Sequence, residues 1–199
     1  MKNKYFKIYI IPILAIGLLT AFDQLTKFIV VSKLELYESI PLIKNVFNFT
    51  YIQNEGVAWG MFQGKRVIFL IITFFVLAFL FLIYNNISDN PKYKFLRILL
   101  VVLTSGAIGN MIDRIKQGYV VDFFDFELIN FPVFNVADIY VTVSMTFLLF
   151  LVIFRLKNDD FEEIITFKKK TTEIGDFEKK EVAGETDLDN DTTLEDVDK

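Results

Sequence analysis

The sequence predicts an all-α membrane protein with four transmembrane helices, a small extracytoplasmic β-sheet and a disordered acidic C-terminal tail. Hydrophobic residues occupy 53% of the 199 positions and aromatic residues 16%, including 23 phenylalanines, which is rich for a soluble domain. Four long apolar stretches alternate with polar connections, and two of these connections contain aromatic, β-branched segments typical of strands. The third observation is an abrupt change of composition near the C-terminus.

Charge is distributed unevenly along the chain. Residues 158–199 hold 15 of the 25 acidic residues but only 6 of the 21 basic ones, so the body is basic and the tail is acidic. The tail is too charged and too poor in apolar residues to form a core. We therefore predict two parts: a four-helix transmembrane domain over residues 1–157 and a disordered cytoplasmic tail over residues 158–199.

The sequence contains neither cysteine nor histidine. Thiol nucleophiles, Ser–His arrangements and HExxH zinc sites are therefore excluded, and we expect no metal, no cofactor and no nucleic-acid partner. Carboxylate chemistry or a Ser–Lys pair remains, and the five serines form no convincing Ser–Lys arrangement.

The first apolar stretch covers residues 8–22 and follows three lysines within the first seven positions. This pattern also fits a secretory signal peptide, but no clear small-x-small cleavage site precedes Asp23, and we expect a retained helix. The helix should run on past Asp23 and Lys27, which are four positions apart and share a face. Their pairing indicates either an interfacial ion pair or part of a functional site.

Residues 32–66 form the first polar connection. Aromatic and polar side chains alternate over residues 46–53 (VFNFTYIQ), which predicts a short strand. Residues 54–60 (NEGVAWG) predict a turn of small residues, with Trp59 at the depth of the lipid headgroups.

Residues 67–84, 98–112 and 139–154 predict the other three spans. The stretch 98–112 carries Gly106 and Gly109, which leave a smooth patch for close helix contact. Its last turns are polar and should face protein or water instead of lipid, at Thr104, Ser105 and Asn110.

Residues 113–138 form the second polar connection. Residues 119–126 are β-branched and aromatic, which predicts an extended, half-buried segment. Pro132 makes a helix over residues 131–134 unfavourable. At the start of the connection, Asp113 and Arg114 can form an ion pair at the membrane edge.

Four spans place both termini on one side of the membrane. The lysines at the start of the chain favour cytoplasmic termini, although the overall bias of basic residues between the two sides is small. Both polar connections then lie outside the cytoplasm.

Ionisable side chains at the edge of a membrane are costly to desolvate, so their default interpretation is functional. Asp122 and Asp138 are candidates for a carboxylate pair that shares one proton: the ionised partner activates a water and the protonated partner donates to the scissile carbonyl. The fold must bring them together, because Pro132 lies between them. Asp138 stands where the last helix begins, and the positive helix end favours its ionised form.

Spacing alone also allows structural roles for these residues. Asp138 can be the N-cap of the last helix and Asn135 can cap a turn. Asp122, Asp125 and Glu127 can each be solvated acids, and spacing does not distinguish Asp122 from Asp125. Two other functions remain open: a small ion-coupled carrier with buried Asp and Arg, and a non-catalytic membrane scaffold that uses the tail. The carrier is disfavoured because the acids cluster near the span ends and not in the middle of the spans.

Five short motifs follow one another along the body: Asp23 with Lys27, residues 54–60 (NEGVAWG), 106–114 (GAIGNMIDR), 120–123 (VVDF) and 134–138 (FNVAD). Together and in this order they resemble the lipoprotein signal peptidase (signal peptidase II) family of bacterial membrane aspartyl peptidases. Two positions depart from the family pattern, Ser105 in place of Gly and Val57 in place of Ala.

The resemblance implies an endopeptidase of the bacterial cell (inner) membrane that cuts prolipoproteins just before a diacylglyceryl-modified cysteine. It implies membrane lipid and a lipidated prolipoprotein as partners, inhibition by globomycin-type lipopeptides, and an active site near the outer membrane surface. With such a substrate, the smooth patch at Gly106 and Gly109 is expected to let a signal-peptide helix approach closely. The catalytic pair falls on Asp122 and Asp138. The supporting or substrate-binding positions are Asp23, Lys27, Asn54, Gly56, Gly106, Asn110, Arg114 and Asn135.

Overall fold

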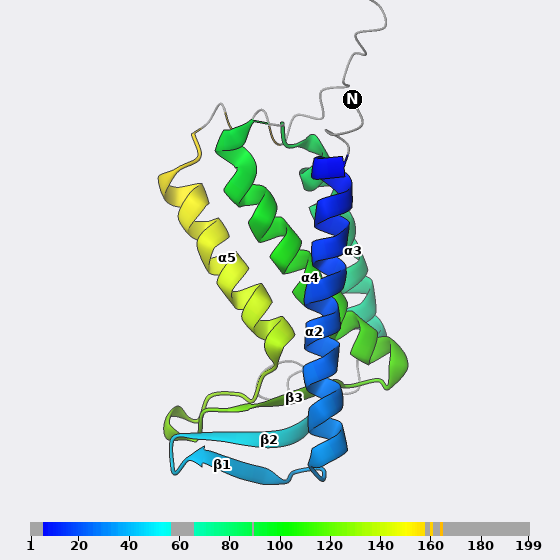
Figure 1. The fold of residues 1–199 in the computed structure, drawn as a ribbon, viewed down its shortest axis with the longest axis vertical. Coiled ribbons are helices and arrows are strands. Elements are labelled where there is room, and N and C mark those ends of the chain that lie inside the picture. The colour runs from blue at the N-terminus through cyan, green and yellow to red at the C-terminus, as the bar shows by residue number, and fades with distance from the viewer. Residues whose placement is uncertain (1–5, 57–65, 89, 158–159, 161–163, 165–199) are drawn as a thin grey trace, which may run out of the picture. The chain divides into compact units, whose positions relative to one another are not determined.

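The structure, a computed structural model, describes residues 6–56, 66–88, 90–157, 160 and 164. Within these residues the long helices run side by side, and a small sheet lies across one end of them (Figure 1). The elements are η1 (Phe6–Ile10, a π-helix), α2 (Ile11–Lys33), β1 (Ser39–Ile43), β2 (Phe47–Asn54), α3 (Arg66–Asn86), η3 (Pro91–Tyr93, 3₁₀), α4 (Lys94–Lys116), β3 (Val120–Asp125), η4 (Glu127–Ile129, 3₁₀) and α5 (Val136–Phe154).

Within the described residues, four helices are long and apolar enough to cross a membrane, and they coincide with the four predicted spans. They cover Ile8–Lys33, Arg66–Asn86, Pro91–Lys116 and Val136–Phe154. The first continues past Asp23 and Lys27, as predicted.

The third span differs from the prediction at its end. Asp113 and Arg114 lie on α4 and not in the polar connection, because the helix continues to Lys116. The backbone N–H of Gln117 donates to the carbonyl of Asp113 at 2.9 Å and closes the last turn. Gly118, with φ of +90°, then reverses the chain, a conformation that glycine adopts without steric strain.

The central helix is α4. In its most apolar stretch 44% of the residues are buried, whereas the corresponding share in α3 is 6%. A Cβ added at Gly106 would lie 2.5 Å from the carbonyl oxygen of Ala137, and one at Gly109 would lie 2.5 Å from a carboxylate oxygen of Asp23. The expectation that a signal-peptide helix approaches this smooth patch is therefore wrong, because α5 and α2 of the same chain already cover it. The two glycines let α4 approach its own neighbours closely.

The sheet is antiparallel, in the order β1-β2-β3, and it confirms the extended segments predicted around residues 46–53 and 119–126. The strand β1 was not predicted, because its sequence SIPLI contains a proline and lacks a period-two pattern. A turn at Asn45, in the left-handed conformation with φ of 61°, joins β1 to β2.

A cluster of buried apolar residues joins the sheet to the ends of α2 and α5. Tyr51 of β2, Val121 and Phe123 of β3, Leu34 just after α2 and Val136 of α5 make up this cluster. Because it contains residues from the elements that flank both polar connections, it holds the sheet against the end of the helices at the level where the acidic side chains lie.

Two predictions fall largely outside the described residues. Residues 57–60, with Trp59, are one, and most of the predicted tail is the other. Two residues of the predicted tail are described and contact the body: Asp160 is hydrogen-bonded to the Tyr93 hydroxyl at 2.7 Å, and Ile164 packs in an apolar cluster with Leu80 and Ile87.

Candidate active site

Asp122 lies on β3 with only 2% of its surface exposed. Its two carboxylate oxygens accept hydrogen bonds from the side-chain amides of Asn54, at 2.8 Å, and Asn135, at 2.6 Å. Each oxygen keeps a second lone pair, so the carboxyl can hold a proton without losing either bond.

A β-bulge brings Asn54 to Asp122. Thr50 and Tyr51 of β2 stand opposite the single residue Phe123 of β3. Because side chains alternate between the two faces of a sheet, this extra residue turns Asn54 onto the face of Asp122. Without the bulge, the same residue would point to the opposite face.

Asp138 is the third residue of α5 and part of a capping box. The Asn135 side chain accepts from the backbone N–H of Asp138 at 3.0 Å, and the Asp138 carboxylate accepts from the backbone N–H of Asn135 at 3.1 Å. The alternative that Asp138 is the N-cap is therefore wrong, because Asn135 occupies that position. The carboxylate lies at the positive end of the helix.

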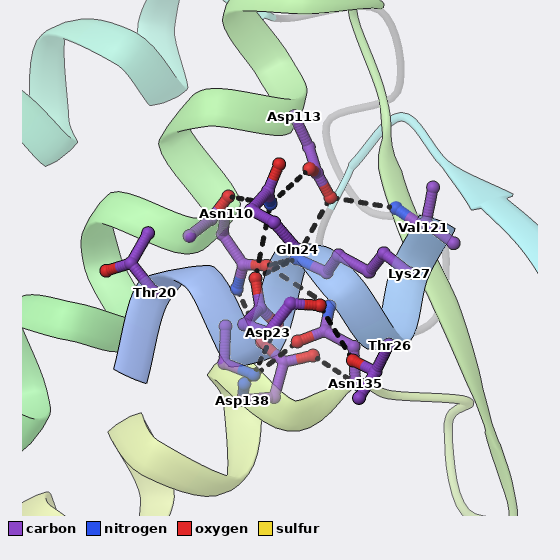
Figure 2. A network of polar contacts seen from close by, with 12 residues as sticks. Thr20, Asp23, Gln24, Thr26, Lys27, Asn110, Asp113, Val121, Asn135 and Asp138 are labelled. Atoms are coloured by element: carbon purple, nitrogen blue, oxygen red, sulfur yellow. Dashed lines mark hydrogen bonds and ion pairs between the residues drawn. The ribbon is translucent and has the colours of Figure 1, made fainter. Parts of the chain in front are cut away.

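Two asparagine amides connect the acids. Asn110 of α4 donates to Asp138 at 2.7 Å, while Asn135 donates both to Asp122 and to the Asn110 side-chain oxygen, the latter at 3.1 Å. Figure 2 shows Asn110, Asn135 and Asp138 converging between α4 and the start of α5. The structure thus brings together, within one hydrogen-bonded network, two acids that are sixteen positions apart in the sequence.

The proton affinity of Asp122 is strongly altered by this environment. Burial raises the pKa of Asp122 from 3.8 to about 7, and the nearby charge of Asp138 adds to the rise. The hydrogen bonds from Asn54 and Asn135 oppose it, since they favour the ionised form. A carboxyl with such a pKa can both hold and release a proton near neutral pH.

Asp125 lies outside this network. It is three positions from Asp122 on the same strand, so its side chain points to the other face of the sheet. There its carboxylate accepts from the Thr50 hydroxyl at 2.8 Å, and Glu127 accepts from the Asn48 amide at 3.0 Å. The fold therefore separates two acids that spacing alone could not distinguish.

Asp23 and Lys27 form an ion pair that is buried inside the protein. Their side chains are 0% and 4% exposed, and the Lys27 ammonium lies 2.9 Å from the carboxylate of Asp23. The same ammonium lies 2.9 Å from Asp113 and donates to Asn110 at 3.0 Å. Asp113 thus pairs with Lys27 of α2 and not with its neighbour Arg114.

Sequence reasoning missed Asp113 and Gln24 as members of this network. Gln24 donates to Asp113 at 2.8 Å and to Asp23 at 3.3 Å. One signal was available: Asp113 lies three positions after Asn110, so the two share a helix face. No comparable signal pointed to Gln24, which stands between two residues that were already candidates.

Arg114 points away from the ion pairs, toward the first polar connection. Its guanidinium donates to the backbone carbonyl of Gly56 at 3.1 Å and lies over the ring of Phe69 at 4.9 Å. Gly56 in turn donates its backbone N–H to the Asn54 side chain at 3.0 Å. Arg114 and Gly56 therefore support the residue that contacts Asp122.

Comparisons with known proteins agree on one family. The family model described as "Signal peptidase (SPase) II" matches residues 15–154. The lipoprotein signal peptidase of Clostridioides difficile is 42% identical over 142 residues, which cover 71% of this chain and 94% of that protein. The lipoprotein signal peptidase of Halothermothrix orenii is 40% identical, covering 71% of this chain and 92% of that protein.

Two solved structures, both described as bacterial membrane enzymes, are similar in fold. One has a TM-score of 0.66 at 33% identity and covers 73% of this chain and 88% of that one. The other has a TM-score of 0.65 at 33% identity and covers 74% of this chain and 96% of that one.

Proposed function

The chain belongs to the signal peptidase II family, and we propose that it is an aspartyl endopeptidase that cleaves diacylglyceryl-modified prolipoproteins just before the lipidated cysteine. Asp122 and Asp138 are the proposed catalytic pair. The observation that carries this proposal is the hydrogen-bonded link from Asp122 through Asn135 and Asn110 to Asp138 at one end of four apolar helices. A water held between the two carboxyl groups would be the nucleophile.

The proposed reaction begins with Asp138 ionised and Asp122 protonated. The water oxygen attacks the scissile carbonyl carbon while Asp138 takes a proton from that water. At the same time, Asp122 gives its proton to the carbonyl oxygen. The tetrahedral intermediate then collapses: Asp138 protonates the leaving amine and Asp122 recovers a proton from the intermediate's hydroxyl. One peptide bond is broken, one water is consumed, and the pair returns to its starting state.

The environments of the two acids support this division of roles. Asp138 accepts from a backbone N–H and an amide at the start of α5, and the helix end there favours its negative charge. Asp122 is more deeply buried, and its raised pKa favours a proton near neutral pH. Asn54, Asn110 and Asn135 hold the carboxyl groups, and Arg114 with Gly56 supports Asn54.

The membrane would position the substrate. The acyl chains of the diacylglyceryl group partition into the bilayer, which places the adjacent peptide bond at the membrane surface. We propose that both termini are cytoplasmic and that the sheet and the acids lie near the outer surface of a bacterial cell membrane. A globomycin-type lipopeptide would inhibit by occupying the same lipid-proximal site.

The test is cleavage by the purified full-length chain in lipid vesicles. We expect it to cut a diacylglyceryl-modified prolipoprotein and to leave the same precursor intact when its cysteine is not lipidated. Failure to cut the lipidated precursor would overturn the proposed function. Solute flux across the same vesicles without cleavage would favour an ion-coupled carrier instead.

A further inference from the structure

A buried carboxylate of α2 holds the residue just before Asp138. Asp23 accepts a hydrogen bond from the backbone N–H of Ala137 at 2.9 Å, and Asp23 is fully buried. Ala137 is the second residue of α5, where backbone N–H groups lack a partner within the helix. Asp23 therefore fixes the beginning of α5, and with it the backbone of Asp138.

A second buried carboxylate holds the residue just before Asp122. Asp113 of α4, 4% exposed, accepts from the backbone N–H of Val121 at 3.2 Å. The strand β3 lies at the edge of the described sheet, so an N–H on its free side needs a partner outside the sheet. Asp113 supplies that partner and fixes the backbone of Asp122.

One ammonium connects the two carboxylates. Lys27 lies 2.9 Å from Asp23 and 2.9 Å from Asp113, and its third hydrogen bond goes to Asn110. All three donors of the ammonium are thereby used. Figure 2 shows Lys27 extending from α2 between these partners, with Val121 on one side and the start of α5 on the other.

We propose that Asp23, Lys27 and Asp113 form a spacer that sets the distance between Asp122 and Asp138. This inference rests on the proposed function. The three residues do not contact the reacting atoms in this scheme; they are positioning residues, each carboxylate holding the residue that precedes one catalytic acid. Without the ammonium, two buried carboxylates would repel each other, and the strand and helix that carry the catalytic pair would move apart.

Asp113 offers a sharp test, because one of its carboxylate oxygens contacts both the Lys27 ammonium and the Val121 backbone N–H. Lys27 and Val121 contact Oδ2, while Gln24 contacts Oδ1. In Asp113→Asn, the amide oxygen can occupy the Oδ2 position and keep both contacts. The Gln24 amide can rotate to accept from the new NH₂, although it then gives up its longer hydrogen bonds to Asp23 and to the Gly109 carbonyl. Asp113→Ala removes all of these contacts.

We expect Asp113→Ala to lower kcat on the order of 10²-fold with little change in KM, because a small misplacement of reacting groups costs about that much. Asp113→Asn should retain most of the wild-type kcat. The alkaline limb of the kcat–pH profile should move to lower pH in Asp113→Ala, since the charge of a more distant Asp138 raises the pKa of Asp122 less. Equal losses in Asn and Ala variants would overturn the spacer, as would an effect confined to KM.

Backbone amide hydrogen exchange gives a readout that does not depend on cleavage. We expect Lys27→Met to increase exchange both in the peptide that contains Val121 and in the peptide that contains Ala137, because the ammonium contacts both carboxylates. Lys92→Met, which removes the half-exposed lysine that pairs with Asp160, is the matched control and should leave both peptides unchanged.

These measurements separate the two proposals. If the wild-type chain fails to cut the precursor while Lys27→Met still increases exchange at both peptides, the function is wrong and the spacer stands. If the wild type cuts and Lys27→Met leaves exchange at Val121 or Ala137 unchanged, the spacer is wrong and the function stands.

Discussion

Among the residues that the structure describes, two lysine–carboxylate clusters stand out, one at each end of the helical bundle. At the end that carries the sheet, Lys27 contacts Asp23 and Asp113, and the three side chains are at most 5% exposed. At the other end, beside η3, Lys92 contacts Asp160, and the Lys92 side chain is 49% exposed. The partners are chemically the same, but water reaches only one of the two clusters.

This difference in burial decides what each cluster contributes. Removing one partner of a buried ion pair leaves an uncompensated charge and costs about 3–5 kcal/mol. An ion pair with a half-exposed lysine is screened by water, and its loss costs far less. Loss of the buried Lys27 ammonium should therefore affect activity and folding strongly, whereas loss of the Lys92 ammonium beside η3 should affect neither strongly.

The largest expected effect is the loss of cleavage on neutralising either acid of the proposed catalytic pair. Asp122→Asn and Asp138→Asn should each lower kcat by at least about 10³-fold, because each removes a proton-transfer group. Asp125→Asn, on the same strand but the other face, should retain most activity, as should Asp160→Asn at the opposite end. Cleavage of a lipidated precursor in vesicles checks this, and substantial activity without Asp122 would contradict the assignment.

The next effect concerns the amide that links the two acids. Asn135→Ala should lower kcat and also the free energy of unfolding, by about 1 kcal/mol for the lost helix cap and more for the Asp122 oxygen that loses its donor. Asn48→Ala, which removes an amide bonded to Glu127 on the sheet, is the matched control. Steady-state kinetics and thermal unfolding measure the two effects, and wild-type kcat in Asn135→Ala would argue against the link.

An effect of intermediate size is expected from pH. Cleavage should decline as the pH rises above about 7, because Asp122 then loses the proton that the pair shares. The shift also affects stability: an acid whose pKa is raised by folding stabilises the fold fully below its ordinary value of 3.8, and this contribution is lost as the pH rises through about 7. A kcat–pH profile that stays flat from pH 6 to 9 would be inconsistent with this state of Asp122.

The smallest effects are expected at the end beside η3. The backbone N–H of Lys157, the ammonium of Lys92 and the hydroxyl of Tyr93 hold the pKa of Asp160 well below its usual range. Its contribution to stability is thus present above pH 3.8 and is lost as the pH falls below that value. Asp160→Asn should lower the Tm slightly at pH 7 without changing kcat.

Removing residues 166–199 should change neither the Tm nor kcat, because the contacts of Asp160 and of the proposed active site all involve residues before 166. Thermal unfolding and the cleavage assay on the truncated chain check this. A marked loss of cleavage would show that the acidic segment takes part in catalysis, and the contrast between the two ends of the bundle would then need revision.

Much of the fold was predictable from local patterns. Uninterrupted apolar runs predicted the spans, and period-two or β-branched aromatic segments predicted β2 and β3. The strand β1 was not predictable in this way, because it is paired only along one edge and all five of its residues are exposed. The continuation of α4 to Lys116 was also missed, since charged residues at a span end do not by themselves end a helix.

The candidate site was only partly predictable. The motifs and the family resemblance indicated Asp122, Asp138 and the asparagines around them, because residue types and spacing are properties of the chain itself. The separation of Asp122 from Asp125 required the alternation of β3, and the approach of Asn54 required the bulge in β2. Neither can be read from spacing, because a one-residue change of register moves a side chain to the other face.

The sequence by itself determined that four segments are apolar enough to cross a membrane, that an acidic segment follows them, and that carboxylates are the main reactive groups. Only the tertiary structure decided which carboxylates are buried together and which lysine lies between them. The physical reason is that hydrophobicity is a property of each segment, whereas the cost and use of a buried charge depend on the partners that distant segments bring to it.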